Sequence, residues 1–169
     1  MERCRIGSVA AGNQFSRVDG MSNVRAATTA DIPELVDAYA WLFAPPGTKP
    51  DDWHPVVAAE RLERAIIGPR SGVLVAVEGE KIVGFGTTYL DLESVRFGQR
   101  CWVEDLAVDP DQRSSGIGAA LLTAARKWAK DHGATHLELD SGTARTDAHR
   151  FYNRHNPTSH SLNFGWQTS

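Results

Sequence analysis

The fold is decided by residues 103–122, which read VEDLAVDPDQRSSGIGAALL. An apolar strand over Val103–Val108 runs into a polar turn, and Gly116 and Gly118 then open a helix. This succession of elements directs several unpaired backbone N–H groups, and the positive end of a helix dipole, at one point in space. Such points bind phosphate groups, so the stretch predicts a phosphate-bearing ligand.

The composition is that of one ordinary globular domain. The chain has 169 residues, of which 41% are hydrophobic and 23% are charged, and its formal net charge is -3. This charge offers no basic patch for nucleic acid, and no apolar run approaches the roughly eighteen residues that a membrane span requires. Cys4 and Cys101 lie in different contexts, which predicts two free thiols; no base stands near Cys101 to activate it as a nucleophile. We expect a cytoplasmic protein with no nucleic-acid or membrane partner.

The first twenty residues differ in character from the rest of the chain. Residues 1–20 lack the apolar core of a signal peptide, and Met21 precedes the first patterned segment. We therefore expect a leader at 1–20 outside the fold, followed by one domain at 21–169.

Hydrophobic periodicity predicts strands and helices along this domain. Strands are expected at 24–27, 73–77, 82–90, 102–108 and 136–140, with a last strand near 161–166. Helices are expected at 32–43, 52–67, 117–131 and 146–154. The order β-αα-βββ-α-β-α-β indicates a mixed α/β sheet.

Several ligand classes use a glycine-rich turn into a helix. A nucleoside-triphosphatase loop needs Gly-Lys-Ser/Thr, but Ala119 and Ala120 follow Gly118. A dinucleotide fingerprint needs a third glycine, and position 121 is Leu121. On the two glycines alone, the favoured interpretation is a turn that only lets the strand and the helix pack closely.

Arg113, three residues before Gly116, separates these interpretations. Arg-x-x-Gly-x-Gly after an apolar strand resembles the acyl-CoA pyrophosphate loop of the GCN5-related N-acetyltransferase (GNAT) superfamily. The resemblance covers roughly residues 24–166 and includes the element order, the strand ending Glu-Asp-Leu-Ala-Val-Asp-Pro and the late segment 148–152 (AHRFY). It implies a single-domain α+β GNAT fold, with a mixed sheet of about six to seven strands and about four helices. It also implies that the strand 102–108 splays from the strand that begins near His136.

The resemblance implies acetyl-CoA as the co-substrate. Backbone amides of the turn would bind its pyrophosphate, and Gly116 and Gly118 would let the chain approach the phosphate oxygens. The carbonyl and N–H groups of the strand end would pair with the pantetheine arm as with an additional strand. The implied positions are Arg113, Ser114, Ser115, Gly116, Ile117 and Gly118 in the turn, and Leu106, Ala107 and Val108 in the strand.

The implied reaction moves an acetyl group directly from a thioester to a primary amine. Glu104 is the predicted general base, because strand alternation places it on the face of Trp102, Leu106 and Val108. Alternation places Asp105 on the opposite face, so the two carboxylates would have different roles. The family's late-helix tyrosine corresponds to Tyr152, which would protonate the departing thiolate.

The acceptor is less well determined. Aromatic side chains beside carboxylates suit a cationic amine, and the expected acceptor-binding residues are Trp41, Phe43, Tyr89, Asp105 and Asp140. The chain departs from the family pattern at Arg145, where asparagine is common, and at Asn156-Pro157, where Gly-Phe is common. The histidines do not have the spacing of a metal site.

A small-molecule amine such as a polyamine, amino sugar or amino-acid derivative is the expected acceptor. The alternatives are a protein lysine or N-terminus, a longer acyl chain, a non-catalytic acyl-CoA-binding module and a nucleotide-binding protein. Homodimerisation stays open.

Overall fold

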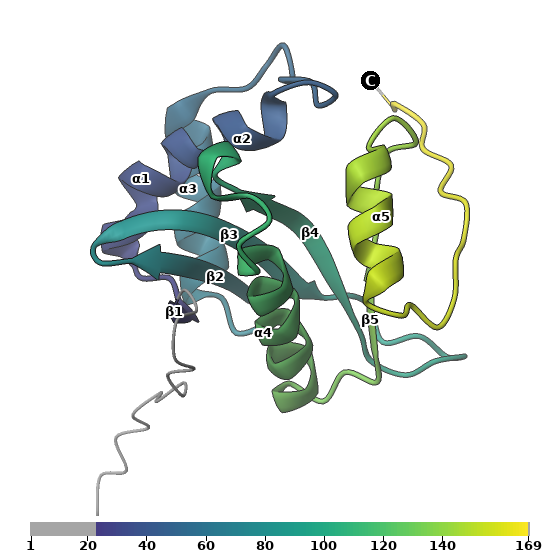
Figure 1. Ribbon diagram of the computed structural model, residues 1–169. Coiled ribbons are helices and arrows are strands. Elements are labelled where there is room, and N and C mark those ends of the chain that lie inside the picture. Colours follow the sequence, from purple (N-terminus) through teal and green to yellow (C-terminus); the bar gives the residue numbers. More distant parts are fainter. Residues whose placement is uncertain (1–22, 169) are drawn as a thin grey trace, which may run out of the picture.

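A computed structural model describes residues 23–168, and the expected leader and Cys4 lie outside these residues. One sheet of five strands runs through the molecule in the order β1-β2-β3-β4-β5. The strands are β1 (Asn23–Ala26), β2 (Ser71–Glu78), β3 (Lys81–Leu90), β4 (Arg100–Val108) and β5 (His136–Leu139). Neighbouring pairs are antiparallel except for β4 and β5, which are parallel (Figure 1).

The helices agree with the expected ones, apart from one break and one shifted start. They are α1 (Ile32–Ala38), α2 (Ala40–Phe43), α3 (Pro55–Ile67), α4 (Ile117–Asp131) and α5 (Thr146–Arg154). Short 3-10 turns lie at Thr29–Asp31 and Pro110–Gln112. The expected helix 32–43 is divided at Tyr39 into α1 and α2, and α3 begins at Pro55 because His54 caps it by accepting from the Val56 N–H.

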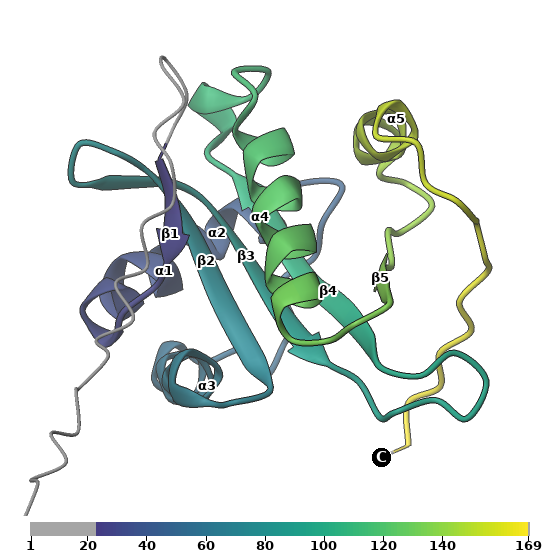
Figure 2. The same cartoon turned by 90° about the horizontal axis from the view of Figure 1, so that it is seen from below.

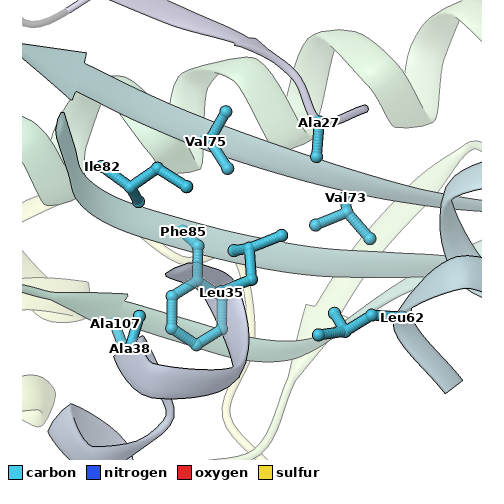
Figure 3. Close-up of a cluster of buried hydrophobic side chains, with 9 residues drawn as sticks. All are labelled: Ala27, Leu35, Ala38, Leu62, Val73, Val75, Ile82, Phe85 and Ala107. Atoms are coloured by element: carbon cyan, nitrogen blue, oxygen red, sulfur yellow. The ribbon is translucent and has the colours of Figure 1, made fainter. Parts of the chain in front are cut away.

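Two hydrophobic clusters hold the layers together, one on each face of the sheet. Helices α1 to α3 cover one face and α4 covers the other, while α5 stands beyond them beside β5 (Figures 1 and 2). Figure 3 shows the first cluster, in which the fully buried ring of Phe85 meets Leu35 from α1. On the other face, Ile117 and Leu121 of α4 pack against strand residues such as Val83. Apolar burial of this kind is the main stabilising contribution of both layers.

The expected last strand near 161–166 is absent, so the count of six to seven strands is wrong for the described residues. No strand occurs between His155 and Thr168. Asn156 has a left-handed φ of 51° and Pro157 has no N–H to donate, so the chain leaves α5 in a turn that does not return it to the sheet. The side chains of Leu162, Phe164 and Trp166 are consequently exposed.

Candidate functional site

A cavity of about 270 Å³ opens where β4 and β5 separate. The two strands pair from Arg100 opposite His136 to Val103 opposite Leu139, and the remaining β4 residues have no partner on that side. The predicted splay of this strand is therefore present. The cavity is lined by the residue between α1 and α2 and by residues of α2, the loop after it, β4, β5, the turn after β5 and α5. They are Tyr39, Leu42, Phe43, Thr48, Pro50, Val103, Glu104, Asp105, Leu106, Leu139, Asp140, Ser141, Gly142, Arg145, Ala148 and Tyr152.

A β-bulge in β4 sets the direction of the side chains at this opening. Thr87 pairs with Asp105 and the next residue, Thr88, pairs with Val103, so Glu104 has no partner on β3. The additional residue reverses the alternation, and Val103 lies on the α4 face together with Leu106.

One expectation based on strict alternation is therefore wrong. Trp102 does not share a face with Leu106 and Val108, because the bulge stands between them. Glu104 and Asp105 both line the cavity, where Asp105 accepts hydrogen bonds from Tyr39 and Thr87.

Glu104 carries the perturbed carboxyl group of the cavity. Partial burial raises its pKa first, and the negative charges of Asp105 and Asp140 raise it further. A carboxylate with a raised pKa binds a proton more readily than an ordinary glutamate. The chemistry available to Glu104 is thus that of a general base.

Asp105 is held by hydrogen bonds on the α1 side of the cavity. Its Oδ2 accepts from the Tyr39 hydroxyl at 2.7 Å and from Thr87 Oγ1 at 3.1 Å. Burial raises the pKa of Tyr39 far above its usual value, and the Asp105 charge adds to this effect. The carboxylate of Asp105 is therefore a fixed negative charge beside Glu104.

Tyr152 brings a phenol from α5 into the same cavity. Burial raises its pKa, and the positive charge of Arg145, two helical turns earlier, opposes the rise. The net effect keeps the hydroxyl protonated at neutral pH. A buried phenol in this state can donate a proton.

The turn from β4 into α4 presents unpaired amides, as its sequence predicts. Gly116 has a φ of 88° and Ser114 a φ of 66°, both in the left-handed region. In residues 23–168, the amides from Arg113 to Gly118 donate no hydrogen bond. Successive free N–H groups before a helix of this length form an anion-binding concavity.

A buried aspartate supports this turn, and the sequence analysis did not identify it. Asp109 accepts from Lys81 Nζ at 2.9 Å and from the Asp111 N–H at 3.1 Å. The hydrogen bond with Lys81 lowers the pKa of Asp109, so its charge is retained. The Asp-Pro pair after an apolar strand was the available signal for such a cap.

Gly118 has a second neighbour besides the expected phosphate. A Cβ added there would lie 3.4 Å from the Phe151 ring of α5 and 3.8 Å from Val108 Cγ2. The small residue therefore also allows α4 and α5 to approach each other at the opening.

The predicted acceptor-binding residues are only partly brought together. Phe43, Asp105 and Asp140 line the cavity, with Asp140 accepting from Asn163 Nδ2. Trp41 and Tyr89 do not line it. Trp41 packs against the first core cluster with its ring 6.3 Å from that of Phe85.

Tyr89 pairs with Trp102 on the neighbouring strand, outside the cavity lining. Partial burial raises the pKa of Tyr89, and the charges of Glu104 and Asp91 raise it further.

Three other residues, Tyr39, Ser141 and Arg145, line the cavity, although they were not among the predicted acceptor-binding residues. For Arg145 the signal was its departure from the family pattern, and for Ser141 it was its place just after the end of a strand.

Two other kinds of chemistry have little support in the described residues. No group of three His, Cys, Asp or Glu side chains in residues 23–168 could hold a metal ion. Burial raises the pKa of the Cys101 thiol to about 11, so this free cysteine is a poor nucleophile at neutral pH.

Within residues 23–168, no helix is long and apolar enough to cross a membrane.

The site can be compared with known proteins. The acetyltransferase (GNAT) family model matches residues 34–156. An aminoglycoside N(6')-acetyltransferase type 1 of Stenotrophomonas maltophilia is 30% identical over 130 residues, which cover 75% of this chain and 79% of that protein. An uncharacterised N-acetyltransferase of Bacillus subtilis (strain 168) is 42% identical over 59 residues, 35% of this chain and 42% of the relative, so the chain spans less than half of that relative.

A solved structure with the same fold contains CoA. It is aminoglycoside N-acetyltransferase AAC(6')-Iy, with a TM-score of 0.74 and 13% identity, covering 92% of this chain and all of the other. At this identity the similarity concerns the fold.

Proposed function

Because the chain belongs to the acetyltransferase (GNAT) family, whose acyltransferases use acetyl-CoA, we propose that it transfers an acetyl group to the primary amine of a small molecule. The observation that carries this proposal is the opening between β4 and β5. From the cavity, which holds the carboxylate Glu104 and the phenol Tyr152, the unpaired edge of β4 leads along the chain to the turn with the free backbone amides. A module that only binds acyl-CoA would need neither of these groups.

The free groups along β4 and the turn fit the co-substrate. The unpaired edge of β4 over Leu106, Ala107 and Val108 offers carbonyl and N–H groups to the amides of the pantetheine arm. The free amides of residues 113–118 suit the pyrophosphate, and Gly116 permits the left-handed turn that aims them. Acetyl-CoA supplies the acetyl thioester to this arrangement.

Glu104 is the proposed base for the amine. An amine with a pKa of about 10.4 is almost entirely protonated at pH 7. The free energy needed to form its reactive, neutral form is about 4–5 kcal/mol. Glu104 would take this proton, directly or through a water, while the amine nitrogen bonds to the acetyl carbon. Asp105 and Asp140 support it, because their charges raise the affinity of Glu104 for the proton.

Tyr152 is the proposed acid for the other half of the reaction. As the carbon–sulfur bond breaks, the departing sulfur needs a proton or an equivalent hydrogen bond. A phenol with a pKa of about 10 is well matched to a thiol with a pKa of about 8.5. Burial raises the pKa of Tyr152, which keeps the hydroxyl protonated at neutral pH but makes it a weaker acid, while the charge of Arg145 opposes this rise.

The acceptor is proposed to be a small amine rather than a macromolecule. The cavity is about 270 Å³ and has acidic side chains on two of its walls, so it suits a compact cationic group. The named activity of the Stenotrophomonas maltophilia relative, on aminoglycosides, is consistent with an amine acceptor.

The test combines ligand binding with one variant. Acetyl-CoA and CoA should raise the melting temperature of the protein, and ATP and NAD should not. With a panel of amines and a free-thiol assay, Glu104→Gln should lower kcat by about 10²–10⁴-fold and should remove the acidic limb of the pH profile. Wild-type turnover in Glu104→Gln across the pH range would falsify the assignment of the base, and the absence of any shift with both CoA species would exclude the function.

A further inference from the structure

One cation faces the acidic cavity, and the proposed chemistry does not use it. Arg145 lines the cavity together with Glu104, Asp105 and Asp140. Within residues 23–168 it forms no ion pair with a carboxylate. A partly buried guanidinium in such a place normally has an anionic partner.

The guanidinium of Arg145 is held in position by one hydrogen bond. Its Nη2 donates to the carbonyl oxygen of Leu42 at the end of α2, at 3.0 Å. Its backbone N–H donates to the Gly142 carbonyl at 2.9 Å, which closes the turn before α5. An arginine carries several N–H donors in a rigid fork, and the described residues use only this one. The remaining donors are available to a ligand in the cavity.

A second unpaired polar group comes from the same turn. Ser141 lines the cavity, and its Oγ is buried without a hydrogen-bond partner among the described residues. A buried hydroxyl without a partner is costly, and such groups commonly meet a ligand or a water. Ser141 stands only four residues before Arg145, so one turn supplies both a cation and a hydroxyl.

We propose that Arg145 and Ser141 bind an acidic group of the acceptor, a carboxylate or a phosphonate. The inference rests on the proposed function and narrows its substrate class to amines that also carry an oxyacid group. The amine would lie toward Glu104, Asp105 and Asp140, and the acid toward Arg145. Both charges of such a molecule would then meet opposite charges, whereas a polycationic amine would meet repulsion at Arg145.

The first experiment compares matched acceptors on the wild-type protein. Amino acids with a terminal amine and two to six carbons are each paired with the amino alcohol of the same length, and aminoalkylphosphonates extend the series. With acetyl-CoA saturating and free thiol measured, at least one acid should exceed its alcohol by about tenfold or more in kcat/KM. Equal kcat/KM for the acid and the alcohol at every length would overturn the proposal.

The second experiment assigns the preference to the two residues. Arg145→Gln should lower kcat/KM for the preferred acid by about 10–100-fold relative to its paired alcohol, and Ser141→Ala should lower the same ratio. The loss of the Arg145 charge near Tyr152 acts on both acceptors alike and cancels in this ratio. Arg145→Lys should recover part of the loss, because it keeps the charge but not the fork. Arg150→Ala is the matched control, since Arg150 is on the exposed face of the same helix and pairs with Asp147. Equal losses for acid and alcohol would mean that Arg145 only supports the fold, which contradicts the proposal.

Calorimetry on the CoA-bound protein separates this proposal from the function itself. If no amine releases thiol but the protein still binds the amino acids more tightly than the amino alcohols, the acid subsite stands and the acetyltransferase proposal fails. If thiol is released and calorimetry shows no preference for the acids, the function stands and the subsite fails.

Discussion

Replacing Gly116 with alanine tests the phosphate-binding turn most directly. Gly116 has a φ of 88°, where an L-residue is disfavoured by about 1–2 kcal/mol. We expect Gly116→Ala to lower the free energy of unfolding by about 1 kcal/mol, which corresponds to about 2–4 °C in melting temperature for a protein of this size. Rotation of this residue out of the left-handed region also moves the free amides around it. The loss of one charge-assisted hydrogen bond to phosphate would weaken CoA binding by about 10–150-fold.

Gly133, at the other end of the same helix, provides the control. Its φ is 78° and an added Cβ there would meet no atom within 4 Å, so Gly133→Ala has the same backbone cost. Stability is measured by urea denaturation and CoA affinity by isothermal titration calorimetry. Both variants should lose similar stability, and only Gly116→Ala should lose CoA affinity. Equal CoA affinity in the two variants would refute the role of this turn in binding pyrophosphate.

Three further predictions concern the proposed acid, the proposed base and the fold. Tyr152→Phe should fold normally and lower kcat by about 10²-fold or more in the free-thiol assay; unchanged turnover would exclude Tyr152 as the acid. Asp140→Asn removes a charge that raises the pKa of Glu104, so the acidic limb of kcat/KM should move to lower pH, and a limb that stays in place contradicts the coupling. Asp31 has a pKa of about 2 beside Arg25, so its stabilisation is present above pH 4 and is lost as the pH falls toward 2. Because Arg25 is 38% exposed, we expect about 1 kcal/mol, visible as a smaller loss of stability in Asp31→Asn than in wild type between pH 5 and 2; parallel curves contradict it.

Local signals in the sequence were sufficient for most of the elements. The helix 117–131 shows the apolar spacing of an amphipathic helix, and its start is marked by glycines, so its expected bounds agree with α4. The hairpin between β2 and β3 was equally local, since Gly79 and Glu80 form its turn. The strand near 161–166 failed because an alternating pattern requires a partner strand, and the turn at Asn156-Pro157 leaves it without one.

The sequence by itself determined the turn around Gly116, because a strand, a left-handed glycine and a helix start are properties of neighbouring residues. It also brought Glu104 and Tyr152 into consideration through the family resemblance. Only the tertiary structure decided that Glu104 and Asp105 share one cavity, since the bulge that overrides alternation depends on the pairing of β4 with β3. The same holds for Arg145 and Ser141, which meet the acidic groups through the packing of α5 beside the parted strands. Contacts between distant segments depend on how their surfaces fit together, and no single segment of the sequence carries that information.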